Sequence, residues 1–371
     1  MKRQSEGQIS KTMNLREYQQ KAVEWAKTRD GLIISPAGSG KTWIAASIIK
    51  HFHKNGAVLR FGWLAPTRET CQQARTSLRV AGVPDEIVDI RCPHESVDFS
   101  KKDMLIVDEA KHSPAAGWRR IIESCNGMRY GFDATPWCDD EDRNAVTRTL
   151  FHNRTYEIKR SDIGDSLADA YLEISDATDL GLHQKIDDNI KRLFDARRRY
   201  MRISDEELQR MCAWESLVDI GICQNNERNQ YAIDYAIEHL DMQTLILIPR
   251  IALGEEYEAS IPNARLVHSK IGKKDRRAYM EEFKDGNLRT MIATSLADEG
   301  LDLPNVELLI MVSGGRSSQK TIQRASRALR KTDTKNCATI VDFSDKFHPI
   351  GAFHARKRQK CYRELGCVFI Q

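Results

Sequence analysis

The stretch GLIISPAGSGKT, residues 31–42, predicts a strand followed by a tight turn and the start of a helix. Its apolar run over residues 32–34 is typical of a buried strand, and the apolar residues after Thr42 recur with helical spacing. Glycines in the turn let the backbone approach phosphate groups closely, so that successive N–H groups can point at them. The stretch therefore predicts a phosphate-binding loop for ATP or GTP, although Ser35 stands where the usual pattern has its first glycine.

Individual residues of this loop have predicted roles. Lys41 is expected to reach the β- and γ-phosphates, and the Thr42 hydroxyl is expected to hold Mg²⁺. The N-terminus of the following helix adds the positive end of its dipole to the same anion site. The residues predicted to bind the nucleotide are Pro36, Ala37, Gly38, Ser39, Gly40, Lys41 and Thr42.

Length and composition indicate a folded protein of two domains. The chain has 371 residues, of which 41% are hydrophobic and 30% charged, and its net charge of +4 permits a polyanionic partner without requiring one. The nine cysteines form no Cys-x-x-Cys pair, so we expect reduced thiols and no zinc site. Residues 1–10 are polar, and no run approaches the roughly 18 apolar residues of a membrane span, so a cytoplasmic location without a membrane partner is expected.

A carboxylate pair, Asp108-Glu109, follows the apolar run at residues 104–107. At the carboxyl end of a buried strand this pair predicts the second half of the nucleotide site. Asp108 is expected to hold Mg²⁺ through water, and Glu109 is expected to polarise the attacking water. An exposed acidic loop is the alternative interpretation, which the phosphate-binding loop upstream makes less favoured.

Strands and helices alternate on both sides of a polar, mostly helical middle region, which is typical of two parallel-sheet domains. We predict an α/β fold with an ATP-binding domain over residues 1–155, a connecting segment with a helical insert over residues 156–230, and a second domain over residues 231–371. Within the insert, Ser204-x-x-Glu207 predicts a helix start. The basic cluster at residues 197–200 is interpreted as a solvated helix face.

A predicted helix of the second domain places Gln323, Arg327 and Arg330 on one face, because they are four and three residues apart. An arginine that stabilises charge on the γ-phosphate in the transition state is the component that the first domain lacks. A surface basic helix is the alternative. We predict that this face acts across a cleft between the domains, which hydrolysis would open and close. Such a cycle moves the protein along a polymer if each domain holds that polymer.

Seven ordered motifs between residues 15 and 330 resemble those of the superfamily 2 helicases, a DEAD/DEAH-like class. They are Leu15-Arg16-x-Tyr18-Gln19 and residues 35–42, 65–68, 108–112, 133–136, 294–304 and 323–330. The resemblance implies two tandem RecA-like domains, hydrolysis of ATP with Mg²⁺, and action on nucleic acid. The branch that looks nearest contains the restriction-enzyme-type motors and the small phage and repair DNA helicases. Lys111 departs from the family pattern, since it stands as an extra residue before His112.

The resemblance implies roles for further residues. Gln19, with Arg16 nearby, would read the adenine, and His112 and Thr135 would couple the nucleotide site to the nucleic acid. The residues that would line the cleft from the second domain are Asp298, Gly300 and Asp302. The residues that would contact the sugar-phosphate backbone are Thr67, Arg68, Arg250, His268 and Thr294. Backbone contacts imply little sequence preference and strong salt dependence.

These features predict an ATP-dependent DNA helicase or translocase that acts through single-strand backbone contacts. An RNA helicase and a nucleic-acid-binding ATP switch that does not unwind remain as alternatives. We expect DNA, single-stranded or branched, to be favoured over RNA. The insert over residues 139–229 is a candidate surface for a protein partner, and the expected location is a bacterial or phage-infected host cytoplasm.

Overall fold

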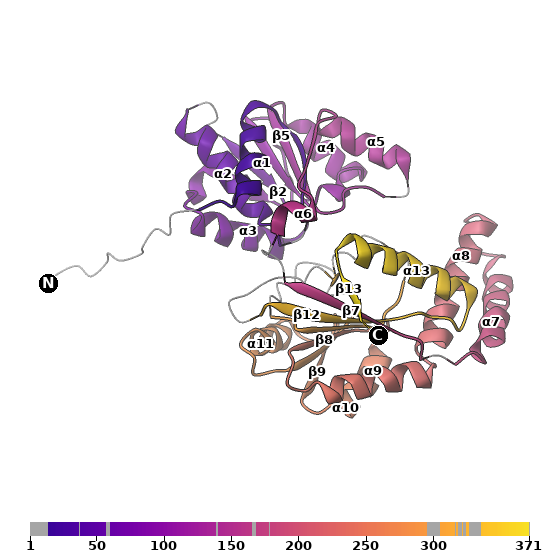
Figure 1. The fold of residues 1–371 in the computed structure, drawn as a ribbon. Helices are drawn as coiled ribbons and strands as arrows, with labels where there is room; N and C mark the ends of the chain where they lie inside the picture. The colour runs from indigo at the N-terminus through magenta and orange to yellow at the C-terminus, as the bar shows by residue number, and fades with distance from the viewer. Residues whose placement is uncertain are drawn as a thin grey trace. The chain divides into compact units, whose positions relative to one another are not determined.

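The computed structural model describes residues 14–36, 38–56, 60–138, 140–164, 168–177, 179–294, 305–315, 317, 321, 324–325 and 335–370. The chain divides into two compact units, residues 1–164 and residues 165–371. Each unit contains one sheet, and Figure 1 shows the first unit in indigo to magenta and the second in magenta to yellow. Among the helices that the structure describes, none has both the length and the apolar composition that a membrane crossing needs.

The first unit is built on a six-stranded parallel sheet. Its strands are β1 (Gly31–Ile34), β2 (Phe61–Leu64), β3 (Val88–Arg91), β4 (Met104–Asp108), β5 (Met128–Asp133) and β6 (Thr155–Glu157). They lie in the order β3-β2-β4-β5-β1-β6. Since the strands are parallel, the loops that follow β1, β2, β4 and β5 all leave the sheet at the same edge.

Helices cover both faces of this sheet, and for this reason the inner strands β1, β2 and β4 are almost entirely apolar. The helices are α1 (Glu17–Thr28), α2 (Lys41–Lys54), α3 (Arg68–Val80), α4 (Ala116–Ser124), α5 (Glu141–Leu150) and α6 (Arg160–Ile163), with 3₁₀ turns η1 (Asp85–Ile87) and η2 (Ala110–His112). Leu105 of β4, Ile122 of α4 and Phe151 after α5 belong to one buried cluster. The apolar run of β4 ends with Asp108, at the edge of the sheet where the loops after β1, β2, β4 and β5 leave it.

The second unit is built on a seven-stranded parallel sheet. Its strands are β7 (Asp169–Ser175), β8 (Thr244–Leu247), β9 (Ala264–Val267), β10 (Thr290–Ala293), β11 (Leu308–Met311), β12 (Cys337–Phe343) and β13 (Val368–Ile370). They lie in the order β13-β7-β12-β11-β8-β10-β9. The prediction of two parallel-sheet α/β domains is confirmed.

Two helical layers cover this second sheet (Figure 1). The described helices are α7 (Leu182–Arg197), α8 (Asp205–Ser216), α9 (Asn226–Glu238), α10 (Ile251–Ser260), α11 (Lys273–Lys284) and α13 (Pro349–Glu364), with a π-helical turn η4 (Leu217–Ile222). One buried cluster joins the sheet to α7–α10 and contains Tyr257 of α10. A second cluster on the other face contains Phe283 of α11, Ala325 and Tyr362 of α13.

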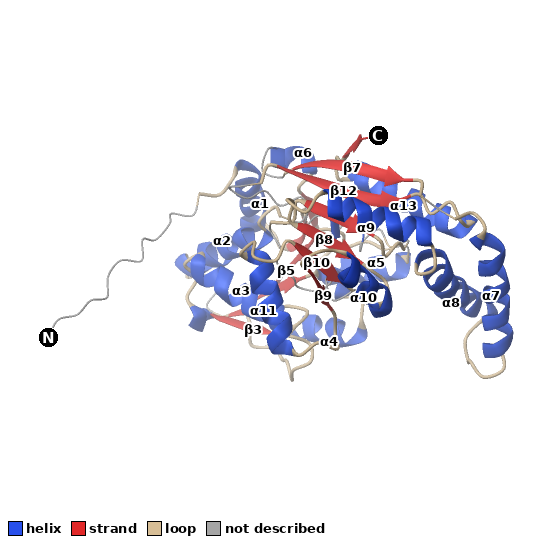
Figure 2. Ribbon diagram, turned by 90° about the horizontal axis from the view of Figure 1, so that it is seen from below, coloured by secondary structure: helices blue, strands red, loops and turns tan. Residues whose placement is uncertain are grey.

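The helices α7 and α8 form a pair at one end of the second unit, side by side in both views (Figures 1 and 2). The side chain of Ser204 accepts a hydrogen bond from the Glu207 N–H (3.2 Å), so the predicted helix start is confirmed. The apolar residues Ile186 and Leu208 bury the pair against the same core as α9 and α10. The helical insert is therefore packed as part of the second unit.

Residues 156–230 differ from the separate connecting segment of the prediction. β6 pairs with β1 in the first sheet, whereas β7 pairs with β12 along its whole length in the second. The hydroxyl groups of Tyr231 and Tyr235 on α9 both donate to the Glu173 carboxylate of β7, the latter at 2.9 Å. The structure places the division between units at residues 164 and 165. The residue pattern of a short strand does not reveal its partner when that partner lies far away in the sequence.

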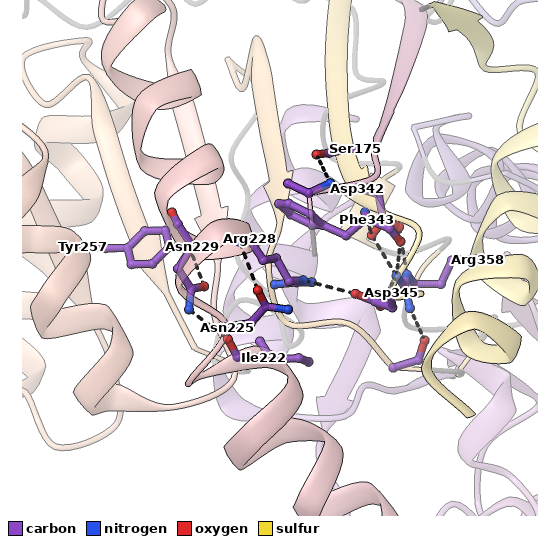
Figure 3. A network of polar contacts seen from close by, with 12 residues as sticks. Ser175, Ile222, Asn225, Arg228, Asn229, Tyr257, Asp342, Phe343, Asp345 and Arg358 are labelled. Carbon is purple, nitrogen blue, oxygen red and sulfur yellow. Dashed lines mark hydrogen bonds and ion pairs between the residues drawn. The ribbon is translucent and has the colours of Figure 1, made fainter. Parts of the chain in front are cut away.

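A buried polar network fixes the end of β12 in the second unit (Figure 3). The guanidinium of Arg358 donates to both carboxylate oxygens of Asp342 (2.8 and 2.9 Å) and to Asp345 (2.8 Å). Arg228 of α9 donates to the other oxygen of Asp345 (3.1 Å), and its guanidinium lies 3.9 Å from the Phe343 ring centre. Two buried arginines and two buried aspartates thus balance in charge and tie α9 and α13 to the sheet.

Candidate nucleotide site and nucleic-acid contacts

The loop after β1 opens directly onto the N-terminus of α2. Gly38 and Gly40 have φ angles of 83° and 79°, in the left-handed region that favours glycine. A Cβ atom on Gly40 would lie 2.5 Å from the amide nitrogen of Gln19, so a side chain there would displace Gln19 from its hydrogen bond to Ser39. Gly40 is the N-cap of α2 and Lys41 is its first residue. The geometry provides an anion site at a helix N-terminus.

Ser35 shows why the first glycine of the usual pattern is dispensable in this loop. Its φ angle is not positive, so no glycine is required. The buried Ser35 hydroxyl accepts a hydrogen bond from the Ser39 hydroxyl (3.0 Å). The backbone N–H of Ser35 donates to the Asp133 carbonyl (2.9 Å). The serine side chain therefore closes the loop upon itself. The ammonium of Lys41 donates to the Ser35 carbonyl at 3.4 Å.

Helix α1 holds the same loop from the other side. The Tyr18 hydroxyl and the Gln19 amide both donate to the Ser39 carbonyl, at 3.0 and 2.8 Å. The Gln19 side-chain oxygen accepts the Arg16 N–H at 2.9 Å. Both ends of the Gln19 amide are therefore bonded within the protein. An adenine read by Gln19 would have to exchange these bonds for its own, so that role stays a prediction.

Three carboxylates and two lysines meet beyond β4 and β5. Glu109 follows Asp108 in a left-handed conformation (φ 53°), which turns its side chain back toward Lys111, at 2.7 Å from the ammonium. The Asp133 carboxylate at the end of β5 accepts the N–H groups of Lys111 and Thr135, both at 2.8 Å. The loops after β1 and β4 leave the same edge of the sheet, and the charge of Lys41 lowers the pKa of both Asp108 and Glu109, so the phosphate loop and the acidic pair form one site.

The three carboxyl groups have different pKa values because their surroundings differ. Burial and the neighbouring charge of Glu109 raise the pKa of Asp108 to about 7. Burial and Glu109 also raise the pKa of Asp133. Burial opposes ionisation of Glu109 too, but the ammonium groups of Lys111 and Lys41 outweigh it and lower the pKa of Glu109. Glu109 is thus the carboxylate that the protein keeps ionised.

The predicted coupling residues lie beside this acidic group. His112 ends η2, and its ring stacks on Trp118 with centroids 5.2 Å apart and planes at 28°. Thr135 follows β5, where its N–H is bonded to Asp133. Both therefore sit on the loops that carry the acidic site. Their positions agree with a coupling role without testing it.

The predicted backbone contacts of the first unit lie after β2. The Thr67 hydroxyl accepts the Thr70 N–H (3.2 Å) and caps α3. Arg68 is exposed, with its guanidinium 3.9 Å from the Glu95 carboxylate. An N-cap and an exposed cation at one helix start can both face a phosphate group.

The predicted backbone contacts of the second unit share one edge of its sheet. Arg250 is the residue just before α10 and follows β8, His268 follows β9, and Thr294 follows β10. β10 lies between β8 and β9, so the three loops are neighbours. Arg250 is exposed and pairs with Asp219 at 3.0 Å. The Nδ1 atom of His268 accepts the Lys270 N–H at 3.3 Å.

Several predicted residues lie outside the described residues, and their roles stay predictions. They are Ala37 in the phosphate loop, Asp298, Gly300 and Asp302 after β10, and Gln323, Arg327 and Arg330 before β12.

The sequence interpretation missed three residues of the nucleotide site. Asp133 ends a buried apolar strand as Asp108 does, and the same signal could have revealed it. Tyr18 lies within the first motif but has no predicted role, although its hydroxyl donates to the Ser39 carbonyl. Lys111 was treated as an insertion, and only the reversed turn at Glu109 reveals its ion pair. No local pattern predicts that turn.

A histidine and aspartate cluster in the second unit joins α7 to α13. The possible ligand atoms of His183, Asp187 and His348 lie within 4.8 Å of one another. The Nδ1 atom of His348 accepts the Ile350 N–H (3.2 Å), so a neutral ring carries its proton on Nε2, which faces Asp187 at 3.1 Å. A protonated ring nitrogen cannot bind a metal ion. We interpret the cluster as a structural contact, in which a hydrogen bond between His348 and Asp187 holds the start of α13 against α7.

Two family models match the chain. The helicase conserved C-terminal domain family matches residues 228–332. The family described as "Type III restriction enzyme, res subunit" matches residues 12–89, which contain the phosphate loop. The two matches lie in different units, in the order in which the predicted motifs occur.

Known proteins resemble the chain over most of its length. It is 23% identical over 378 residues to the "DNA 3'-5' translocase XPB2" of Sulfurisphaera tokodaii, covering 91% of this chain and 83% of that protein. It is 24% identical over 346 residues to the "Putative DNA 3'-5' helicase Rad25" of Halobacterium salinarum, covering 86% of this chain but about half, 52%, of the relative. The Hef helicase domain of Pyrococcus furiosus has the same fold, with a TM-score of 0.59 at 14% identity, covering 88% and 94% of the two chains.

Proposed function

We propose that the chain, which belongs to the superfamily 2 helicases, hydrolyses ATP to move along DNA. One observation carries the proposal. The phosphate loop with Lys41 and the acidic pair Asp108-Glu109 lie at one edge of one sheet, close enough for the lysine to act on both carboxylate charges. This is the arrangement that hydrolysis of a nucleoside triphosphate needs.

The residues at this edge suit Mg²⁺. The Asp108 and Thr42 side chains offer the oxygen ligands that Mg²⁺ prefers. An ionised Asp108 would place a second negative charge beside that of Glu109, and burial opposes it, so a cation would relieve the cost of ionising Asp108. We propose that Thr42 and, through water, Asp108 hold the ion. When bound, Mg²⁺ would offset charge on the phosphate oxygens.

The remaining residues would carry out hydrolysis. Lys41 would leave the Ser35 carbonyl, a weak partner at 3.4 Å, for the β- and γ-phosphates. Glu109, ionised through Lys111 and Lys41, would orient and polarise the attacking water. Gln323, Arg327 and Arg330 of the second unit would stabilise the charge that develops on the γ-phosphate. Asp298, Gly300 and Asp302 would line the site from the same unit.

DNA is the proposed track. The relatives from Sulfurisphaera tokodaii and Halobacterium salinarum are named as a DNA translocase and a putative DNA helicase. In this chain the predicted backbone contacts follow β2 in one unit and β8, β9 and β10 in the other. Contacts to the sugar-phosphate backbone give affinity without sequence preference. The insert over residues 139–229, which contains α7 and α8, is the proposed surface for a protein partner.

The rate of ATP hydrolysis with different nucleic acids tests this proposal. We expect single-stranded DNA to raise the steady-state rate by about tenfold or more over the rate without nucleic acid, because the strand orders both units for hydrolysis. We expect a smaller increase with RNA of the same sequence. The stimulation should weaken as salt is raised, since phosphate contacts release counterions.

Two results would change the conclusion. A rate that RNA raises more than DNA would assign the chain to RNA instead. A rate that no nucleic acid changes, in a protein that hydrolyses ATP, would contradict a motor on either polymer.

A further inference from the structure

A crevice of about 760 Å³ lies in the second unit. One side is formed by the loops after β8, at residues 248–250, and after β11, at residues 313–315. The other side is formed by α8, with Arg210, Met211 and Trp214, and by Ile350 and His354 of α13. Every residue that forms the crevice belongs to the second unit.

The topology of the sheet explains why a crevice opens at this point. β8 and β11 are neighbours, but the chain leaves them toward opposite faces. After β8 it enters α10, whose Leu253 and Tyr257 pack in the cluster on one face. After β11 it reaches Ala325, which packs in the cluster on the other face. The two loops diverge, and open parallel sheets bind their ligands at the carboxyl ends of such strands.

The side chains of the crevice combine aromatic surface with positive charge. Trp214 and Met211 on α8 are 38% and 41% exposed, which is unusual for large apolar side chains. The Trp214 ring lies against His354, with centroids 5.8 Å apart, and its tip would be 3.5 Å from a Cβ atom on Gly315. Arg210, Arg250 and Arg324 line the same space, and among the described residues that line it Glu207 is the one carboxylate. The lining therefore favours a ligand with a flat apolar face and an anionic group.

Hydrogen bonds hold the described residues on the floor of the crevice. Arg324 is only 9% exposed, and its guanidinium donates to the Ser313 hydroxyl at 2.7 Å. The Arg358 guanidinium donates to the Gly315 carbonyl at 3.0 Å, which anchors the loop after β11 to the buried network. A pre-formed site loses little entropy when a ligand binds.

We propose that this crevice binds one unpaired nucleotide of the DNA strand, with its base on Trp214 and Met211 and its phosphate toward Arg250 and Arg210. The inference rests on the proposed function. Arg250 connects the two, since it lines the crevice and also belongs to the predicted backbone contacts at the edge formed by β8, β10 and β9. Its ion pair with Asp219 is half exposed, so a phosphate can compete for it. Stacking on an aromatic ring tolerates any base, as a motor on DNA requires.

The test compares two side chains and two oligonucleotides without ATP. Binding of an oligothymidylate and of an abasic oligonucleotide of the same length is measured by fluorescence anisotropy for the wild type, Trp214→Ala and Trp214→Phe. Phe353→Ala is the matched control, since Phe353 is an exposed aromatic side chain on α13 that does not line the crevice. Circular dichroism melting verifies that each variant is folded.

We expect Trp214→Ala to bind the oligothymidylate about tenfold more weakly than the wild type, with most of the affinity restored in Trp214→Phe. The wild type should lose a similar factor on the abasic oligonucleotide, and Trp214→Ala should then bind both oligonucleotides equally. Phe353→Ala should match the wild type.

Two results would overturn this inference alone. The first is that Trp214→Ala binds the oligothymidylate as tightly as Phe353→Ala does. The second is that Trp214→Ala weakens binding of the abasic oligonucleotide by the same factor as binding of the oligothymidylate. A wild type that binds the two oligonucleotides equally would exclude a base site without reference to any variant. A wild type that binds neither would instead contradict the proposed function itself.

Discussion

Lys41→Ala is expected to lower ATP hydrolysis by about 10³-fold, with or without DNA. The substitution removes the ammonium proposed to bind the β- and γ-phosphates at the N-terminus of α2. It also removes a positive charge that lowers the pKa of both Asp108 and Glu109, so the acidic pair loses part of its compensation. Steady-state phosphate release measures the loss of hydrolysis. Binding of a fluorescent ATP analogue measures the loss of nucleotide affinity.

Two further variants give this experiment its controls. Lys50→Ala removes a lysine of the same helix that also donates to a backbone carbonyl, that of Ala81 at 3.1 Å, but away from the loop. It should hydrolyse ATP at the wild-type rate. Arg330→Ala should bind ATP and fail to hydrolyse it, because its proposed role begins in the transition state. Normal hydrolysis by Lys41→Ala would contradict the nucleotide site, and normal hydrolysis by Arg330→Ala would contradict the arginine assignment.

Arg358→Ala is expected to destabilise the second unit by about 3–5 kcal/mol. Arg358 is 1% exposed, and its guanidinium compensates Asp342 and shares Asp345 with Arg228. Without it, two buried carboxylates face one buried arginine. Burial would lower the pKa of Arg358, but the two aspartates outweigh it and raise that pKa, so the guanidinium is charged in the folded protein. Urea denaturation followed by circular dichroism measures the change in the free energy of unfolding.

Arg363→Ala is the matched control for this substitution. Arg363 lies on the same helix, α13, but is exposed and stacks on Phe369 at 4.9 Å. Its loss should cost about 0.5–1 kcal/mol. If Arg358→Ala unfolds at the same urea concentration as Arg363→Ala, the network does not hold the sheet and α13 together.

The sequence predicted those parts of the molecule that depend on neighbours along the chain. The phosphate loop is a contiguous stretch between a strand and a helix, so residues 31–42 alone indicate its conformation. Asp108 and Glu109 follow an apolar run that needs burial on both faces. The alternation of strands and helices was enough to predict two parallel sheets, which the structure confirms.

Long-range pairing could not be predicted in this way. β7 has the pattern of a short strand, and only its pairing with β12, more than 160 residues later, assigns it to the second sheet. The ion pair of Arg228 and Asp345 spans 117 residues. The crevice combines α8, two strand ends and α13, and no single stretch of the sequence indicates that these elements meet. Such contacts depend on the packing of whole units, which local periodicity does not encode.

Displacement of streptavidin from biotin at either end of a single-stranded DNA tests the central claim most directly, because it requires ATP hydrolysis to produce directed movement. The account predicts that the wild type with ATP displaces streptavidin faster from one end than from the other. Lys41→Ala with ATP, and the wild type with a non-hydrolysable analogue, should displace none. DNA-stimulated hydrolysis without displacement from either end would contradict the account and indicate an ATP-driven switch that binds DNA without moving along it.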